Sequence, residues 1–163
     1  IATGARPSIN LAGPLQVDAW GVQAQVQACR SLGLKRVVLV SSLCAGRWLH
    51  PLNLFGLILV WKRLGERCLE RSGLDWTVIR PGGLSEDDSR STKEGVLVTD
   101  ADQQQSNSIP RRLVAQMCLD ALEQPQACGR ILEITSSPSQ PQQPLGQCLD
   151  QMPSRSQITP RLA

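Results

Sequence analysis

The chain is poor in the residues from which several common kinds of site are built. It has one histidine, His50, with no clustered acidic or cysteine partner beside it, which argues against a metal site. It has no run of basic residues, and a net charge of +3 is too small to indicate a nucleic-acid-binding protein. Its longest apolar stretch, from Leu54 to Trp61, has eight residues, whereas a membrane span needs about 20. We therefore expect no metal site, nucleic-acid partner or membrane span.

The six cysteines form no Cys-x-x-Cys pair. They stand among residues typical of helices and strands, which is the pattern of free, buried thiols. A reducing compartment, the cytoplasm, is therefore expected. Cys44 follows two serines, but no base stands beside it in the sequence, which favours a structural role over a nucleophilic one.

The composition is that of one globular domain, with 41% hydrophobic and 19% charged residues. The chain opens inside an apolar phrase that leads to a glycine, its first residue is Ile1, and no signal peptide precedes that phrase. We therefore expect a natural fragment or a clipped chain.

Three short apolar runs have the pattern of strands that are covered on both faces. They are residues 37–41, 76–79 and 131–134. Three helical patterns alternate with them. The first, with apolar residues at 22, 26, 29 and 32, stops at Gly33, the second runs from about residue 53 to 71, and the third covers 111–123.

This alternation builds right-handed β-α-β units and predicts an α/β domain with a doubly wound parallel sheet of the Rossmann type. The domain would cover residues 1–136, with its first strand ending at Ile1-Ala2. Residues 85–108 break the rhythm and are predicted as a solvated loop with one short strand. Residues 137–163, rich in Pro, Gln and Ser, are predicted as a disordered tail.

Open α/β sheets bind ligands beyond the carboxyl ends of their strands, so the phrases that follow the strands are candidate sites. Each of these phrases, at residues 2–5, 41–43 and 80–83, is small or contains glycine, which lets the backbone approach a flat ligand closely. Glycines are also common turn residues after strands, so each phrase alone is weak evidence.

Two charged residues have alternative interpretations. Lys62 is placed for a surface pair with Glu66 four residues later, or it could reach over the strand ends and donate to ribose hydroxyls. Asp18 could cap the helix that follows it or touch the site, and capping is favoured.

Four phrases together resemble the atypical short-chain dehydrogenase/reductase family, and within it the NmrA-like NAD(P)-binding proteins of plants and cyanobacteria. They are Ser41-Ser42, His50-Pro51-Leu52-Asn53, Ile58 to Arg63, and Thr77 to Leu84, and Ala2-Thr3-Gly4 agrees with them. The resemblance covers residues 1 to about 135. It implies that NADP or NAD is the cofactor.

The resemblance also implies roles for particular residues. In such proteins the phrase matching residues 2–5 runs beside the adenosine and ribose, the two serines lie near the nicotinamide, and the lysine bonds the nicotinamide ribose. The implied catalytic residues are Ser42 and Lys62. The implied cofactor-binding residues are Ala2, Thr3, Gly4, Ala5, Ser41, Ser42, Lys62, Arg80, Pro81, Gly82, Gly83 and Leu84.

Two features depart from the family. Classical members have a tyrosine proton donor four residues before the lysine, but here that position is Ile58, and the chain has no tyrosine. Isoleucine cannot donate a proton, so the usual acid catalysis is not available. The glycine-rich turn that holds the pyrophosphate in this family is also not among the 163 residues.

These observations leave two functional hypotheses. One is an NAD(P)-dependent oxidoreductase of unusual mechanism, acting on a small molecule that the sequence does not identify. The other is a non-catalytic NADP-sensing or scaffold module, which would bind a protein partner through the region from Leu54 to Trp61. The expected compartment is the cytoplasm, or the plastid stroma for a plant protein.

Overall fold

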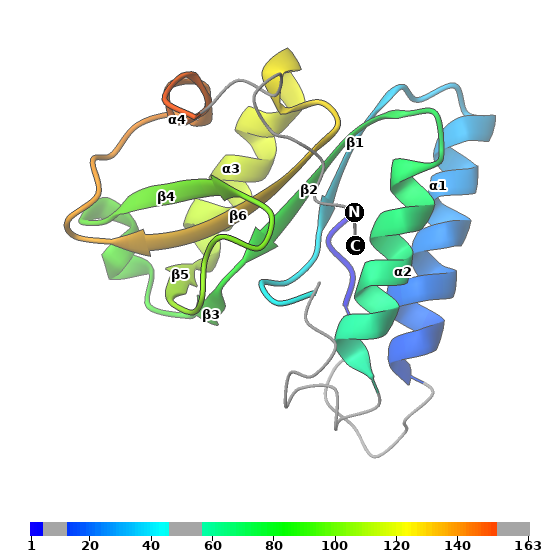
Figure 1. Ribbon diagram of the computed structural model, residues 1–163, viewed down its shortest axis with the longest axis horizontal. Helices are drawn as coiled ribbons and strands as arrows, with labels where there is room; N and C mark the ends of the chain where they lie inside the picture. The colour runs from blue at the N-terminus through cyan, green and yellow to red at the C-terminus, as the bar shows by residue number, and fades with distance from the viewer. Residues whose placement is uncertain (5–12, 46–56, 153–163) are drawn as a thin grey trace.

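A computed structural model of the chain describes residues 1–4, 13–45 and 57–152 (Figure 1). Its main sheet has four strands in the order β1-β2-β6-β4. The strands are β1 (Arg36–Val40), β2 (Asp75–Pro81), β6 (Arg130–Ser137) and β4 (Gly95–Asp100). The first three run parallel, as predicted, while β4 pairs with β6 in the antiparallel direction. The predicted α/β architecture of the Rossmann type is confirmed.

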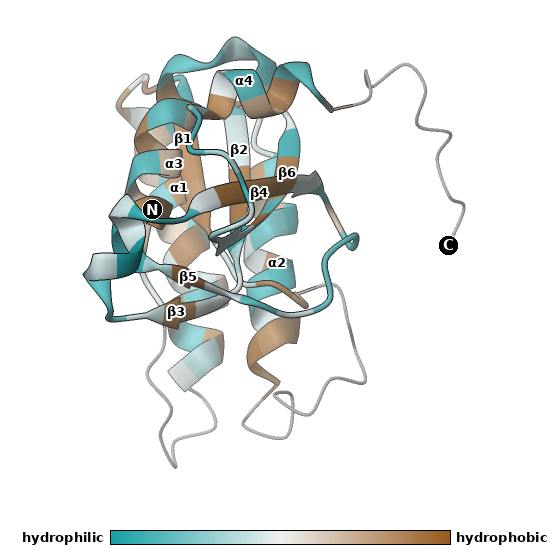
Figure 2. Ribbon diagram, turned by 90° about the vertical axis from the view of Figure 1, so that its left-hand side faces the viewer, coloured by the Kyte–Doolittle hydropathy of each residue, from teal (hydrophilic) through white to brown (hydrophobic). Residues whose placement is uncertain are grey.

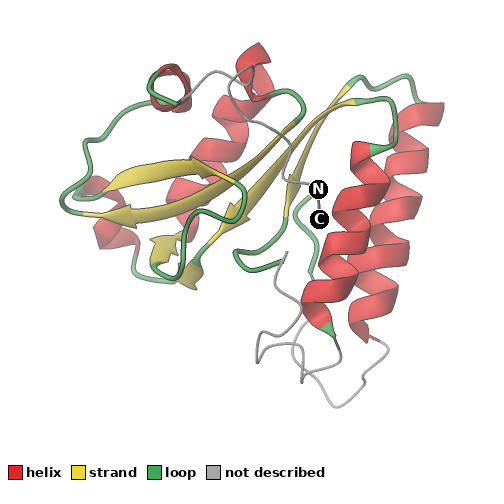
Figure 3. Ribbon diagram, viewed as in Figure 1, coloured by secondary structure: helices red, strands yellow, loops and turns green. Residues whose placement is uncertain are grey.

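Helices cover both faces of this sheet, which gives three layers (Figure 3). On one face lie the π-helical segment η1 (Leu15–Gly21), α1 (Val22–Ser31) and α2 (Ile58–Glu70). On the other lies α3 (Arg111–Glu123), whose bounds are those predicted. The side chains of β1 alternate between the layers: Val37 and Leu39 pack with α1 and α2, while Val38 packs with α3. The sheet therefore separates two apolar clusters of the core, and a third, smaller cluster joins Leu43, Cys44 and Leu59.

The helices end where the sequence indicates. Gly33 follows α1 and Gly73 follows α2, both with positive φ angles of 69° and 77°, a conformation that glycine adopts without strain. The part of the second helix predicted before residue 57 lies outside the described residues. Within the described ranges, no helix combines the length and apolar character that crossing a membrane requires.

The segment predicted as a solvated loop has more structure than expected. Strand β3 (Gly83–Ser85) pairs in parallel with β5 (Ser108–Pro110), and a 3-10 helix, η3 (Asp88–Thr92), lies between β3 and β4. Short strands and single helical turns carry too few periodic apolar residues to stand out in a sequence. These elements hold residues 101–107 near the ends of β2 and β6.

The prediction of a disordered tail from residue 137 is wrong for its first part. The short helix η4 (Pro125–Ala127) precedes β6, and Ser137 is the last residue of β6. The helix α4 (Leu145–Asp150) then follows within the predicted tail. As Figure 2 shows, α4 carries both apolar and polar positions. Its Leu145, Cys148 and Leu149 are buried in the cluster around α3, so three apolar residues anchor a polar segment. Residues 153–163 lie outside the described part.

Candidate functional site

The strand-end phrases predicted from the sequence lie together at one edge of the sheet (Figure 1). The Val40 N–H donates to the carbonyl oxygen of Ile1 at 2.9 Å, which places the first phrase beside the end of β1. The Leu43 N–H donates to the carbonyl oxygen of Pro81 at 2.8 Å, which places the second phrase beside the third. The three phrases are thus neighbours, because the strands that carry them are parallel. Ala5 lies outside the described residues.

Lys62 points to this edge from α2, but its partner differs from the one predicted. Its Nζ atom lies 2.9 Å from Oδ1 of Asp18, a residue inside η1 that is only 2% exposed. Of the two alternatives for Lys62, the surface pair with Glu66 is therefore wrong, because Glu66 turns inward to Arg80. The predicted capping role of Asp18 is also wrong, since Asp18 lies within a helical segment and its carboxylate faces the lysine.

A small hollow adjoins this ion pair. Thr3, Asp18, Ser41 and Lys62 line it together with three apolar residues, and its volume is about 10 Å³. Gly4 stands beside it, since a Cβ atom at this glycine would lie 3.6 Å from the lysine Nζ atom. A space of this size holds about one water molecule. The hollow can therefore receive one polar group, such as a hydroxyl, but not an aromatic ring.

Some of the predicted site residues stand outside this hollow. Ser42 is half-buried, and its described contact is through its backbone, whose oxygen accepts the N–H of Ala45. Gly82 packs closely against the carbonyl oxygen of Asn107, and its neighbour Gly83 is exposed. The structure thus joins Lys62 with Thr3, Gly4 and Ser41, but it does not add Ser42 or Gly82 to that hollow.

A second and larger concavity lies on the other side of β1. An apolar groove of about 620 Å³ runs between the edge of β1 and α3, lined by Val38, Cys118 and Leu122 among others. Ala2 and Leu84, both predicted to bind the cofactor, line this groove. Its size falls in the range of small-molecule sites. The predicted cofactor residues are therefore divided between the groove and the hollow.

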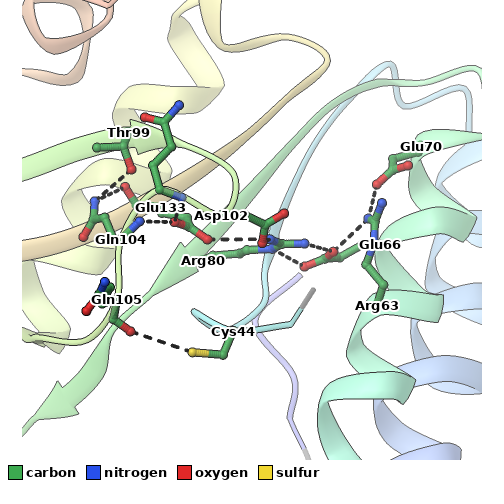
Figure 4. Close-up of polar contacts among 11 residues, drawn as sticks. Cys44, Arg63, Glu66, Glu70, Arg80, Thr99, Asp102, Gln104, Gln105 and Glu133 are labelled. Atoms are coloured by element: carbon green, nitrogen blue, oxygen red, sulfur yellow. Dashed lines mark hydrogen bonds and ion pairs between the residues drawn. The ribbon is translucent and has the colours of Figure 1, made fainter. Parts of the chain in front are cut away.

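Arg80 lies at the centre of a buried network of charges (Figure 4). Its side chain is 1% exposed, and its guanidinium donates to both carboxylate oxygens of Glu66, at 3.0 and 2.8 Å. The same group contacts Asp102 at 3.2 Å and the buried Glu133 at 3.6 Å. The side chain of Arg80 thus serves packing and charge balance inside the domain, which leaves only its backbone to border a cofactor.

The network extends from Arg80 in two directions. Glu133 accepts the backbone N–H groups of Gln103 and Gln104, at 3.0 and 2.8 Å, and so holds the segment that follows β4. Arg63 joins Glu66 to Glu70 along α2. One set of charges therefore ties the lysine-bearing helix, the central strands and the 101–107 segment together.

The charges in this network shift the pKa values of its members. Burial is the largest single influence on Glu66 and raises its pKa, but the hydrogen bonds and charge of Arg80, with smaller contributions from Ser41 and Arg63, outweigh it. The pKa of Glu66 is therefore held below its ordinary value. Burial alone would lower the pKa of Arg80, but its bonds to Glu66 raise it. Both groups are charged at neutral pH.

The lowered pKa of Glu66 predicts how stability depends on pH. A depressed carboxyl pKa stabilises the folded state above the ordinary pKa of glutamate, about 4.3, and this contribution is lost as the pH falls through the lower folded value. We expect Glu66→Gln to be less stable than the parent chain at pH 7, and the gap to narrow toward pH 3. Urea unfolding at a series of pH values measures the gap, and a gap that stays constant would contradict the role of this carboxylate.

The cysteine thiols and the described residues of the Leu54–Trp61 region differ in burial. All six thiols are free, and burial raises the pKa of Cys118 and Cys148, which disfavours the reactive thiolate. Cys44 is buried, with its Sγ atom directed at the carbonyl oxygen of Gln105.

In the predicted partner region, Leu59 is 2% exposed and Leu57 is 47% exposed. His50 and residues 54–56 lie outside the described ranges.

The chain is similar to proteins of known sequence and structure. It is 37% identical over 149 residues to the uncharacterized chloroplastic protein At2g34460 of Arabidopsis thaliana, a match that covers 86% of this chain and 52% of the relative. It is 35% identical over 130 residues to sanguinarine reductase of Eschscholzia californica, covering 77% and 47%. The chain thus spans about half the length of these relatives.

A solved structure and a family of domains also match the chain. A putative NAD-dependent epimerase/dehydratase from Bacillus halodurans superposes with a TM-score of 0.78 at 29% identity, covering 91% of this chain and 66% of that structure. Residues 1–125 match a family of domains described as NAD(P)H-binding. With a three-layer Rossmann fold and a lysine at the strand ends, the chain belongs to this NAD(P)H-binding family of atypical short-chain dehydrogenases/reductases, whose cofactor is NADP or NAD.

Proposed function

We propose that this chain forms the nicotinamide side of an NAD(P)-dependent oxidoreductase that works without the usual catalytic tyrosine. The observation that carries the proposal is the Lys62 ammonium, fixed 2.9 Å from Asp18 beside Thr3, Gly4 and Ser41 at the strand ends. A relative with 35% identity is named as a reductase, which supports the reaction class. The substrate remains a small molecule of unspecified class.

The residues present fit the nicotinamide ribose. An ammonium group has three N–H donors, and the bond to Asp18 uses one, so Lys62 can still donate to ribose hydroxyls. Gly83 is exposed and has no atom crowded against it, so a flat group can approach its backbone. The cofactor, when bound, supplies the hydride. In this proposal Lys62 holds the sugar, and Ser42 borders the nicotinamide.

Replacing Lys62 by methionine tests the proposal. Reduced nicotinamide mononucleotide is the appropriate probe, since it carries the nicotinamide ribose and needs no pyrophosphate-binding turn. Loss of a hydrogen bond from a charged donor costs about 1.5–3 kcal/mol, so we expect binding to weaken by roughly 10- to 100-fold. Titration followed by the fluorescence of the reduced nicotinamide measures the change.

Lys35→Met is the matched control. Lys35 is exposed and directly precedes β1, at the opposite edge of the sheet, so its loss removes the same charge far from the proposed site. Binding by this variant should equal that of the parent chain. If Lys62→Met binds the mononucleotide as tightly as Lys35→Met does, Lys62 is not the ribose contact.

A specific observation favours a second candidate, a non-catalytic module that senses NADP and binds a protein partner. Isoleucine occupies position 58, where classical members have the proton-donating tyrosine. Leu57, exposed at the start of α2, is the described part of the proposed partner surface. Incubation with NADPH and a panel of quinones and aldehydes separates the candidates: turnover abolished by Lys62→Ala supports the enzyme, and binding without turnover supports the sensor.

The proposed compartment depends on the source of the chain. The relative from Arabidopsis thaliana is named as chloroplastic, which supports the plastid stroma for a chain of plant origin. For any other source the cytoplasm remains the proposal, in keeping with six free thiols.

A further inference from the structure

We infer that Asp18 is a positioning residue, whose carboxylate fixes the Lys62 ammonium in the direction from which it meets the hydroxyl groups of the nicotinamide ribose. The inference rests on the proposed ribose contact of Lys62 and extends it to a residue on a different helix. Neither sequence pattern nor the resemblance assigns Asp18 this role.

Burial favours a close contact between the two residues. Asp18 is 2% exposed and the side chain of Lys62 is 16% exposed, with 2.9 Å between Oδ1 and Nζ. A carboxylate removed from water needs a cation or donors close by, because an uncompensated buried charge is costly. Lys62 supplies a positive charge to Asp18, and the pairing restricts the lysine side chain, whereas an exposed lysine would sample many rotamers.

The backbones of the two helices approach closely at this point. Gly65 lies one turn beyond Lys62 on α2, and a Cβ atom there would stand less than 3.0 Å from the carbonyl oxygen of Asp18. Asp18 itself lies in η1, and π-helical turns are rare and frequently occur at functional sites. A glycine on one helix and a widened turn on the other thus bring the carboxylate within reach of the lysine.

The other carboxylate near Lys62 is already engaged. Glu66, four residues along the same helix, would be the default partner of an exposed lysine, but it is fully buried against Arg80. Lys62 and Glu66 therefore point to different partners, Asp18 and Arg80. Glu66 ties the helix to the strands, and Lys62 is left to Asp18 at the edge of the hollow.

The pairing also indicates what the hollow receives. With the lysine charge balanced by Asp18, the remaining N–H donors face a space of about 10 Å³ that Thr3 and Ser41 border. A neutral hydroxyl satisfies such donors in a space of that size, whereas a free phosphate is larger and would lie near the carboxylate. The geometry therefore fits a sugar hydroxyl.

A double-mutant cycle with reduced nicotinamide mononucleotide tests the inference. Asp18→Asn keeps the shape of the side chain and removes its charge, so we expect binding to weaken roughly tenfold. If Asp18 acts through Lys62, the double variant Asp18→Asn with Lys62→Met should bind no more weakly than Lys62→Met alone. Equal binding by Asp18→Asn and the parent chain, or effects that add in the double variant, would overturn it.

Asp100→Asn is the matched control. Asp100 pairs with Arg130 at the same 2.9 Å, with both side chains mostly buried, but it lies on β4 away from the hollow. The Asp100→Asn variant should lose about as much unfolding free energy as Asp18→Asn does, but its mononucleotide binding should be unchanged. Failure of the ribose proposal remains distinguishable, because in that case Lys62→Met itself leaves binding unchanged.

A measurement without ligand gives an independent readout. The ammonium protons of a lysine that is held in a buried pair exchange slowly enough to appear in ¹H–¹⁵N NMR spectra, whereas those of a mobile lysine do not. We expect the Lys62 signal in the parent chain and in Asp100→Asn, and its loss in Asp18→Asn. A Lys62 signal that persists at full intensity in Asp18→Asn would contradict the positioning role.

Discussion

Replacing Arg80 by methionine is expected to lower the free energy of unfolding by about 3–5 kcal/mol, the cost of leaving buried charges without their partner. The reason is the geometry around the guanidinium, where Glu66 and Glu133 are 0% and 1% exposed. Methionine fills a similar volume but offers no positive charge, so two carboxylates would remain in the interior. Urea unfolding at pH 7 measures the loss.

Arg63→Met serves as the control for this variant. Arg63 pairs with Glu66 and Glu70 from the rim of the same network, where its side chain is 23% exposed, so its loss should cost less than about 1 kcal/mol. The double variant Glu66→Met with Arg80→Met removes charges of both signs and should recover part of the stability. A loss for Arg80→Met no larger than that for Arg63→Met would show that the network does not stabilise the fold.

Gly82→Ala is expected to destabilise the chain by about 1–3 kcal/mol, the usual cost of overpacking. A Cβ atom at residue 82 would stand less than 3.0 Å from the carbonyl oxygen of Asn107, which is backbone and cannot rotate away. The neighbouring Gly83 donates its N–H to that same oxygen at 2.9 Å, so moving Asn107 would also break the bond that starts the β3–β5 pair.

The adjacent glycine provides the comparison. A Cβ atom at Gly83 would meet its nearest neighbours at 3.8 and 3.9 Å, which is ordinary van der Waals contact. Gly83→Ala should therefore change the thermal unfolding midpoint little, whereas Gly82→Ala should lower it by several degrees. Similar midpoints for the two variants would mean that the backbone at Asn107 can move aside at little cost, which would contradict the predicted overpacking at residue 82.

The main elements of the fold were predictable because their signals are local. Continuous apolar runs marked β1, β2 and β6, and Gly33 and Gly73 marked the ends of two helices. The antiparallel direction of β4 was not predictable, because a run such as Val96–Val98 does not specify its neighbour. The helix α4 was missed because its apolar residues are few and the surrounding segment has the composition of a linker.

The partners of the charged residues were much less predictable. Spacing along a helix suggested Lys62 with Glu66, yet the partner of Lys62 lies 44 residues earlier in the chain. Contacts between distant segments depend on how layers pack, and no local pattern encodes them. The position of the small residues at the strand ends was predictable, because the carboxyl ends of parallel strands lie at the same edge of a sheet. That neighbourhood follows from the topology alone.

A signal for the buried network was nevertheless present in the sequence. Glu66 falls on the apolar stripe of α2, between Leu59 and Leu69, which are both buried. Arg80 and Glu133 likewise stand next to the buried apolar residues Ile79 and Leu132 of β2 and β6. Charges of opposite sign at core positions of neighbouring elements are rarely tolerated singly, so their presence together indicates that they pair.

The strand order has a consequence for how the chain reaches its folded state during synthesis. Of the described strands, β6 is the last to leave the ribosome, yet it lies between β2 and β4. Until Ser137 has emerged, β4 has no neighbour in the main sheet, and the backbone N–H and C=O groups along one edge of β2 are unpaired. Nascent chains that stall before this point would present the unpaired strand β4 and an open edge of β2, which makes them candidates for chaperone capture and for aggregation.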